Sequence, residues 1–324
     1  MSTASIDPTS IGSALADAIA RVAPSVLHVT ANDRIASGVV WSSAEGLVVT
    51  SSRLFHEQRD ATITIDAGHG ARRATLVGID EATELALVRL DAAGEGALID
   101  ATWLDDGARV GLFVAPVART TSGVRTTFGV LTRVGPAWVT ARGGTVDAFL
   151  DVDGTLPPGF SGGPLVDVGG RVLGVNTRGL VPGGATLPTP TVRRVVGLIA
   201  AGTSTTPGHL GVGIQSVDLP EHLRVDPAVA RGLLVTGVVP GSAAERAGLA
   251  AGDVIVAIDG RPIPDHAHLL AALAGKVGAT VKIRVARHGQ AIDVEATPGA
   301  REERRRRGPP IAQAWRGFWG KGCR

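Results

Sequence analysis

The segment Gly159-Phe160-Ser161-Gly162-Gly163-Pro164-Leu165 places a serine between glycines, directly before an apolar run. Because glycine lets the backbone turn tightly, the amides of Gly159 and Ser161 can converge as hydrogen-bond donors on a developing oxyanion. The stretch is therefore typical of a loop that presents a serine nucleophile. Such a serine needs a base, so the rest of the chain has to be searched for one.

Three further segments precede this loop, and all four resemble segments of one known family. They read Ala36-Ser-Gly-Val-Val40, Gly46-Leu-Val-Val-Thr50 and Thr83-Glu-Leu-Ala-Leu-Val88, followed by Phe149 to Leu165. In this order they resemble the HtrA family, trypsin-like serine proteases with a C-terminal PDZ domain. The resemblance implies a mainly β fold: a chymotrypsin-like double β-barrel of two six-stranded barrels, followed by a PDZ domain, which is a small barrel-like α/β sandwich.

The chain divides into five parts on this basis. Residues 1–22 form an N-terminal segment, in which Ser10 to Arg21 is predicted to be helical because Ile11, Leu15, Ile19 and Val22 recur on one face. Residues 23–200 form the trypsin-like domain. The small polar run 201–208 is a linker, 209–298 is the PDZ domain, and 299–324 is a basic tail with tryptophans.

Matching the family motifs assigns the catalytic positions and shows a departure. The family continues the second segment as Thr-Asn-x-His-Val, whereas this chain reads Thr50-Ser-Ser-Arg-Leu54, so Arg53 stands at the histidine position. Glu84 stands at the aspartate position, and Ser161 is the nucleophile position, with Gly159 in the oxyanion hole. Phe160 and Pro157 also replace the family's small polar residue and asparagine.

Arginine cannot act as the base, because its guanidinium has no acceptor lone pair and stays protonated. The sequence therefore predicts a pseudoprotease, with Arg53 and Glu84 forming a buried salt bridge beside Ser161. The alternative is an active serine endopeptidase that uses Ser161 with a non-standard base, for which His56 is the candidate. Residues 183–188 take the place of the family's substrate-pairing strand.

The second domain has its own turn and cap signals. Ser242 and Glu245 form a predicted capping box, and Asp259-Gly260 predicts a hairpin after the strand Val254–Ile258. By resemblance to the HtrA-type PDZ domain, the amides of Leu210, Gly211 and Val212 hold a peptide's C-terminal carboxylate, and the strand after them adds the peptide. The predicted peptide-binding residues are Leu210, Gly211, Val212, Ile214, Leu269 and Leu270. Protein C-termini or unfolded segments with apolar side chains are the expected partners.

The remaining features concern cofactors, location and charge. The eight histidines and single cysteine show no metal-ligand spacing, so neither a metal nor another cofactor is expected. Because no signal peptide or transmembrane pattern is visible, a cytoplasmic location is expected, with peripheral membrane contact through the tail.

The tail holds eight of the 32 basic residues and two of the 30 acidic ones, which favours an anionic membrane or a nucleic acid as partner; a solvated tail without a partner is the alternative. No aromatic residue precedes Trp41, so the aromatic contacts used by family trimers find no support in the N-terminus.

Overall fold

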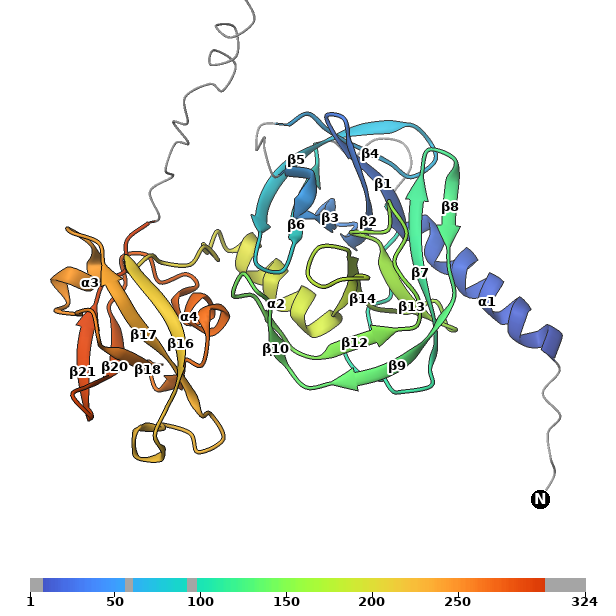
Figure 1. Ribbon diagram of the computed structural model, residues 1–324. Helices are drawn as coiled ribbons and strands as arrows, with labels where there is room; N and C mark the ends of the chain where they lie inside the picture. Colours follow the sequence, from blue (N-terminus) through green and yellow to red (C-terminus); the bar gives the residue numbers. More distant parts are fainter. Residues whose placement is uncertain (1–7, 56–60, 92–97, 301–324) are drawn as a thin grey trace, which may run out of the picture.

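The computed structural model describes residues 8–55, 61–91 and 98–300, which form two β-barrels and a separate smaller domain (Figure 1). The first barrel is closed in the order β1-β2-β3-β6-β5-β4. Its strands are β1 (Val26–Ala31), β2 (Arg34–Ser42), β3 (Leu47–Ser51), β4 (Ile63–Asp66), β5 (Ala71–Asp80) and β6 (Leu85–Leu90). A short 3-10 turn, η2 (Ser52–Phe55), follows β3 and carries Arg53.

The second barrel has six strands in the order β13-β14-β15-β12-β9-β7, closed by pairing of β13 with β7. These are β7 (Phe113–Thr120), β9 (Gly129–Gly135), β12 (Phe149–Val152), β13 (Pro164–Asp167), β14 (Val172–Thr177) and β15 (Ala185–Pro188). Strand β8 (Gly123–Thr126) pairs only with β7, and β10 (Trp138–Val139) with β11 (Thr145–Val146) forms a separate hairpin. The double barrel predicted from the sequence is confirmed.

One apolar core joins the two barrels. Val39, Val49 and Leu87 of the first barrel pack in the same cluster as Val117 and Val175 of the second. Strand β3 is buried on both faces, since one face points to this shared core and the other into its own barrel. That double burial explains the continuous β-branched and apolar run in its sequence. The shared core fixes the relative position of the loops that leave both barrels.

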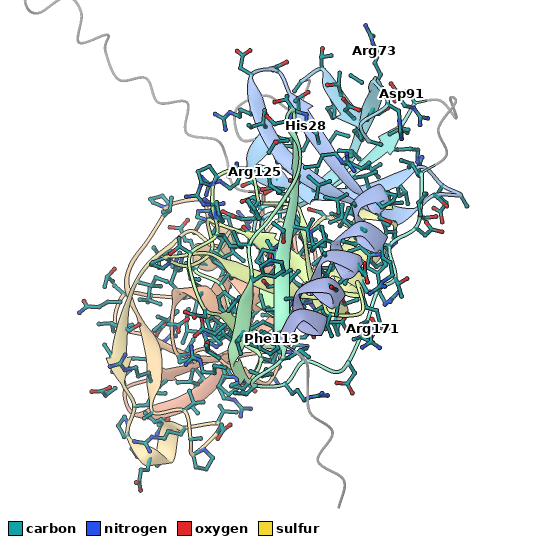
Figure 2. The ribbon with its side chains drawn as sticks, turned by 90° about the vertical axis from the view of Figure 1, so that its right-hand side faces the viewer. His28, Arg73, Asp91, Phe113, Arg125 and Arg171 are labelled. Atoms are coloured by element: carbon teal, nitrogen blue, oxygen red, sulfur yellow. The ribbon has the colours of Figure 1, made fainter. Side chains whose placement is uncertain are left out.

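Two helices flank the barrels. Helix α1 (Pro8–Val22) confirms the predicted N-terminal helix and lies along β7 and β13 (Figure 2), where it buries Ala18 and Val22. Arg21 fixes its end by donating to the carbonyls of Gly169 and Val168 (3.2 and 3.3 Å). Helix α2 (Thr189–Ala200) packs on β5 and β14 and lies between the barrels and the last domain (Figure 1).

The smaller domain is a twisted antiparallel sheet with two helices. The sheet order is β16-β17-β18-β20-β21, with β19 paired to β18. Its elements are β16 (Val212–Asp218), the 3-10 turn η3 (Glu221–Leu223), β17 (Arg231–Val238), α3 (Ala243–Arg246), β18 (Val254–Ile258), β19 (Arg261–Pro262), α4 (His266–Leu273), β20 (Val281–Arg287) and β21 (Gln290–Ala296). A further 3-10 turn, η1 (Ala23–Ser25), precedes β1 in the first barrel. The strand bounds Val254–Ile258 match the prediction.

Local signals read from this domain's sequence have the expected geometry. Ser242 Oγ accepts from the Glu245 amide (3.2 Å), and the Glu245 carboxylate reaches back to the Gly241 amide (2.6 Å). Asp259 and Gly260 both have positive φ (47° and 76°), as a tight two-residue hairpin turn requires. Helix and hairpin are therefore set by their own short sequences.

The domain contacts the barrels through helix α4. A Cβ added at Gly143, in the turn between β10 and β11, would lie only 2.5 Å from the Leu270 Cβ. Gly143 also has φ +83°, so the position suits glycine on two counts. The close approach of this turn to α4 depends on a residue without a side chain.

Within the described residues, no helix is both long and apolar enough to cross a membrane.

Candidate active site

The serine loop lies where the barrels meet, and strand β2 of the first barrel holds it. Ser37 Oγ donates to the Gly159 carbonyl (2.8 Å), and the Ser37 amide donates to the Ser161 carbonyl (3.0 Å). A Cβ at Gly162 or Gly163 would lie under 3.0 Å from a backbone carbonyl oxygen of the neighbouring strands. The two glycines after the serine are therefore needed for packing, not only for turning.

Two backbone amides of the loop remain open for a ligand. Among the described residues, the Gly159 and Ser161 amides have no hydrogen-bond acceptor. The Phe160 carbonyl accepts from the Gly163 amide (3.1 Å), and a trans peptide bond directs the following N–H the opposite way, so the Ser161 amide points away from Gly163. Both amides are thus available to an anion, as the sequence predicts for an oxyanion hole.

The Ser161 hydroxyl has a backbone partner. In the part of the chain that the structure describes, its only hydrogen bond comes from the Arg178 amide, which donates to Ser161 Oγ (3.2 Å). This bond engages an acceptor lone pair of the hydroxyl, whereas an attacking serine needs an acceptor for its proton. His56, the alternative base, lies outside the described residues.

Arg53 and Glu84 form the predicted ion pair, but with different burial. Arg53 Nη1 lies 3.8 Å from Glu84 Oε1, and the arginine side chain is 52% exposed while that of the glutamate is 2% exposed. Since the contact is long and one partner faces solvent, the expected fully buried salt bridge is wrong. The charge of Arg53 is solvated, and that of Glu84 is stabilised elsewhere.

Glu84 is held mainly by the second barrel. Its carboxylate accepts from Thr177 Oγ1 at the end of β14 and from the Gly179 amide (3.1 Å). Its backbone lies in the left-handed region (φ 60°), a conformation that costs free energy in a non-glycine residue. The Glu84 carbonyl also accepts from the Ser52 amide (2.9 Å), which fixes the turn that carries Arg53.

Phe160 is an internal anchor of the loop. It is 1% exposed and packs with Ala118 and Leu156. The aromatic side chain at this position therefore points into the second barrel, away from the hydroxyl of Ser161. A small cavity of about 30 Å³ lies beside Leu156, between β12 and residues 183–186, and none of its lining residues belongs to the serine loop.

The predicted substrate-pairing strand is wrong. Residues 185–188 form β15, which pairs with β14 on one edge and β12 on the other and is buried throughout. A strand with both edges occupied offers no backbone groups to a peptide. The glycines and prolines that mark this segment belong to its turns and to the start of α2.

Sequence reasoning missed three residues that shape the site: Ser37, Thr177 and Arg178. Ser37 fixes the loop, Thr177 holds Glu84, and Arg178 contacts the serine hydroxyl. The first belongs to a segment quoted above only for its likeness, so the motif contained the signal. Thr177 ends β14 and Arg178 follows it, and nothing in their spacing predicts either contact.

The loop predicted to bind a carboxylate in the smaller domain has its carbonyls turned inward. The carbonyls of Leu210 and Gly211 accept from the amides of Ala244 and Val239 (both 2.8 Å). The following amides, those of Gly211 and Val212, therefore point the opposite way, away from α3. Gly211 has φ +81°, and a Cβ there would collide with Ser242.

The side chains predicted for the peptide groove divide into two groups. Leu210 and Leu269 are buried in the domain core, whereas Val212 and Ile214 of β16 are half-buried beside it. Leu270 lies against Gly143 of the barrel hairpin. The apolar lining that the structure offers to a peptide is consequently smaller than the sequence suggested.

Among the described residues, no three His, Cys, Asp or Glu side chains form a group that could hold a metal ion. The basic segment 301–324, and with it the predicted contact with lipid or nucleic acid, lies outside the described residues.

Two family models match the chain. Residues 36–175 match a trypsin-like peptidase domain, and residues 234–287 match a PDZ domain. The chain is 29% identical over 273 residues to the periplasmic pH-dependent serine endoprotease DegQ of Escherichia coli, covering 81% of this chain and 59% of that one. It is 30% identical over 276 residues to a probable periplasmic serine endoprotease, DegP-like, of Brucella suis, covering 82% and 52%.

A solved structure of the HtrA-type protease AlgW with a decapeptide superposes with a TM-score of 0.68 at 27% identity, covering 89% of this chain and 98% of that one. This chain spans between 52% and 59% of the length of the two relatives named above. Because those relatives are named periplasmic, the cytoplasmic location expected from the sequence is contradicted.

Proposed function

Because this chain belongs to the HtrA family of trypsin-like peptidases with a PDZ domain, we propose that it binds polypeptide and that its serine cleft does not hydrolyse it. The observation that carries the proposal is Arg53 beside Glu84, at the place where the family motif has its histidine. A guanidinium cannot accept the serine proton. Loss of a triad histidine lowers turnover by about a million-fold in a related mechanism.

The PDZ domain is proposed as the main peptide-binding element. The inward carbonyls of Leu210 and Gly211 support this, because they leave the following amides to a C-terminal carboxylate, and β16 has a free edge for strand addition. The decapeptide in the AlgW structure supports peptide binding by analogy. A segment with a free, apolar C-terminus is the proposed ligand, in a scaffold or quality-control role, and amidation of that terminus should abolish its binding.

A second candidate is an active serine endopeptidase that uses Ser161 with a non-standard base. The names of the two relatives reported above favour it, since both are endoproteases. The intact serine loop with two open amides is compatible with it as well. Such an enzyme would need an acceptor for the Ser161 proton, and His56 is the candidate.

Labelling of the full chain with a fluorophosphonate probe tests the proposal, since this reagent reacts with an activated serine. Wild type, Ser161→Ala, Arg53→His and the double variant Arg53→His/Ser161→Ala are compared, with a trypsin-like protease as positive control. Ser122→Ala, at an exposed turn between β7 and β8, is the matched control for loss of a serine.

We expect no labelling of wild type or Ser122→Ala, and labelling of Arg53→His that disappears in the double variant. That result would mean that the scaffold lacks only its base. Labelling of wild type that is lost in Ser161→Ala alone would reject the proposal and establish the endopeptidase.

A further inference from the structure

Three arginines lie in segments near the serine loop, and each comes from a different element. Arg53 lies in η2 of the first barrel, Arg178 follows β14, and Arg125 lies on β8. The Arg178 amide contacts Ser161 Oγ, and a Cβ added at Gly179 would collide with Arg53 Nη1, so Arg53 reaches across to the Arg178–Gly179 segment. The Arg125 guanidinium lies 5.9 Å from the ring centre of Phe160.

The positive charge of this cluster faces solvent, and little opposes it. Arg178 and Arg125 are exposed, and among the described residues neither side chain has an ion pair. The carboxylate that meets the cluster is Glu84, which is buried and already accepts from Thr177 and the Gly179 amide. Since the buried and hydrogen-bonded Glu84 carboxylate neutralises only part of the charge of these arginines, the surface between Arg53 and Arg178 is cationic.

The serine loop adds two neutral donors to these charges. The Gly159 and Ser161 amides have no acceptor among the described residues. Adjacent backbone amides that point into one concavity bind anions, and guanidinium groups form strong charge-assisted bonds with carboxylates. In a protease these amides meet negative charge only in the transition state. With Arg53 and the exposed Arg178 in the neighbouring segments, this loop is suited to a permanent negative charge.

We propose that this cleft binds a carboxylate side chain, Asp or Glu, of an acidic polypeptide segment. The carboxylate lies on the Ser161 loop amides and pairs with Arg178 and Arg53. This assignment rests on the proposed function, because a stable complex requires that the bound segment is not cleaved. It names a ligand chemistry for the cleft that is separate from the C-terminal carboxylate taken by the PDZ loop.

The test measures binding of a fluorescent acidic peptide by anisotropy to the full chain. The peptide is C-terminally amidated, so that the PDZ carboxylate loop has no ligand, and it is compared with the same peptide carrying Gln and Asn for Glu and Asp. The variants are Arg178→Gln and the matched control Arg89→Gln. Arg89 is likewise exposed, and it lies four residues along β6 from Leu85, about 13 Å from the Glu84 end.

We expect the acidic peptide to bind at least about tenfold tighter than its amide version, which corresponds to about 1.4 kcal/mol. Arg178→Gln should lose most of this preference and Arg89→Gln should keep it. Since the tail 301–324 is present in wild type and in both variants, any attraction of the acidic peptide to its basic residues cancels when Arg178→Gln is compared with Arg89→Gln. Equal affinity for both peptides, or equal loss in both variants, would overturn the inference.

Two further measurements distinguish failure of this inference from failure of the proposed function. Full displacement of the acidic peptide by inorganic phosphate alone at similar concentration would identify a simple anion site and overturn the peptide assignment. Mass spectrometry of the bound peptide tests the premise: cleavage at the acidic segment would refute the proposed function. An intact peptide without acidic preference would refute only this inference.

Discussion

At the scale of single residues, the site differs from the family motif at one side chain more than at any other. Arg53 replaces a group that accepts a proton with one that only donates, so one residue changes what the loop can do chemically. Around it, Glu84 is held by a hydroxyl from the second barrel, and the serine loop is bonded to β2. Among the described residues, the loop therefore has two backbone donors without an acceptor, and the Ser161 hydroxyl has no side-chain base.

The energetic role of the Glu84 contacts can be measured directly. Thr177→Val removes a hydroxyl donor from a buried carboxylate and should lower the free energy of unfolding by about 1–3 kcal/mol. Arg53→Ala should cost less than about 1 kcal/mol, because the arginine is half exposed and the contact is 3.8 Å long. Urea denaturation checks both values. A larger loss of stability in Arg53→Ala would contradict this expectation and would mean that the ion pair stabilises the fold as strongly as a buried salt bridge.

His28 predicts a pH dependence of stability. It lies on β1 where the upper end of β7 meets the first barrel (Figure 2), and burial lowers its pKa, an effect that Asp66 partly opposes. The cationic Arg119 of β7 lies at the same junction, where it donates to the Val26 carbonyl. The unfolded chain then binds more protons than the folded chain just below the normal histidine pKa, so stability falls as the pH drops through that value.

The change His28→Gln removes this group. Between about pH 7.5 and about pH 5.5, the variant should lose less stability than wild type, by at most about 1.4 kcal/mol, because only about one pH unit of this range lies below the normal histidine pKa. His222→Gln, at an exposed position of the smaller domain, is the control and should behave as wild type. Thermal unfolding at both pH values checks this. Identical pH dependence in all three proteins would contradict it.

At the scale of elements, glycines decide how closely the serine loop approaches its neighbours. Strand β2 meets the loop through Ser37, β7 passes behind it at Val117, and β14 leaves toward Arg178. Three strands converge on one turn only because Gly162 and Gly163 lack side chains. The sequence pattern of the loop thus serves packing of both barrels as well as presentation of the serine.

The change Gly163→Ala tests this convergence. The added methyl would meet the Val117 carbonyl, so we expect a loss of about 3 kcal/mol or more in unfolding free energy. Gly197→Ala in helix α2, where nothing lies within 4 Å of the added atom, should instead stabilise by about 0.5–1 kcal/mol. Melting temperatures of the two variants should move in opposite directions. A parallel shift would contradict the argument.

At the scale of the whole molecule, the PDZ domain is connected to the barrels by the linker and by a close contact of helix α4. That contact joins Leu270 of α4 to Gly143 of the β10–β11 turn, and the base of the same turn bonds to the loop before Glu84, since Thr140 Oγ1 donates to the Ala82 carbonyl (2.7 Å). The helix that forms one side of the predicted peptide groove is therefore connected, through the β10–β11 hairpin, to the loop that precedes Glu84 in the first barrel.

The change Gly143→Ala should open this contact. Its methyl would clash with Leu270, whereas Gly111→Ala places a methyl at a similar positive φ (+86° against +83°) with no atom within 4 Å. We expect a larger radius of gyration by X-ray scattering for Gly143→Ala than for Gly111→Ala, with melting temperatures of the barrels similar in the two. Equal scattering from both variants would show that the contact does not set the domain arrangement.

The sequence alone determined the double barrel, the second domain and the arginine at the histidine position of the motif, because each depends on local patterns: glycines around Ser161, β-branched strands, and the turn at Asp259-Gly260. It also predicted that Arg53 and Glu84 meet. Only the tertiary structure decided that this pair is half exposed, that β15 is buried between two strands, and that Thr177 and Arg178 reach Glu84 and Ser161. These outcomes depend on how two barrels pack on one shared core, and residues about 90 positions apart, such as Thr177 and Glu84, become neighbours only through that packing.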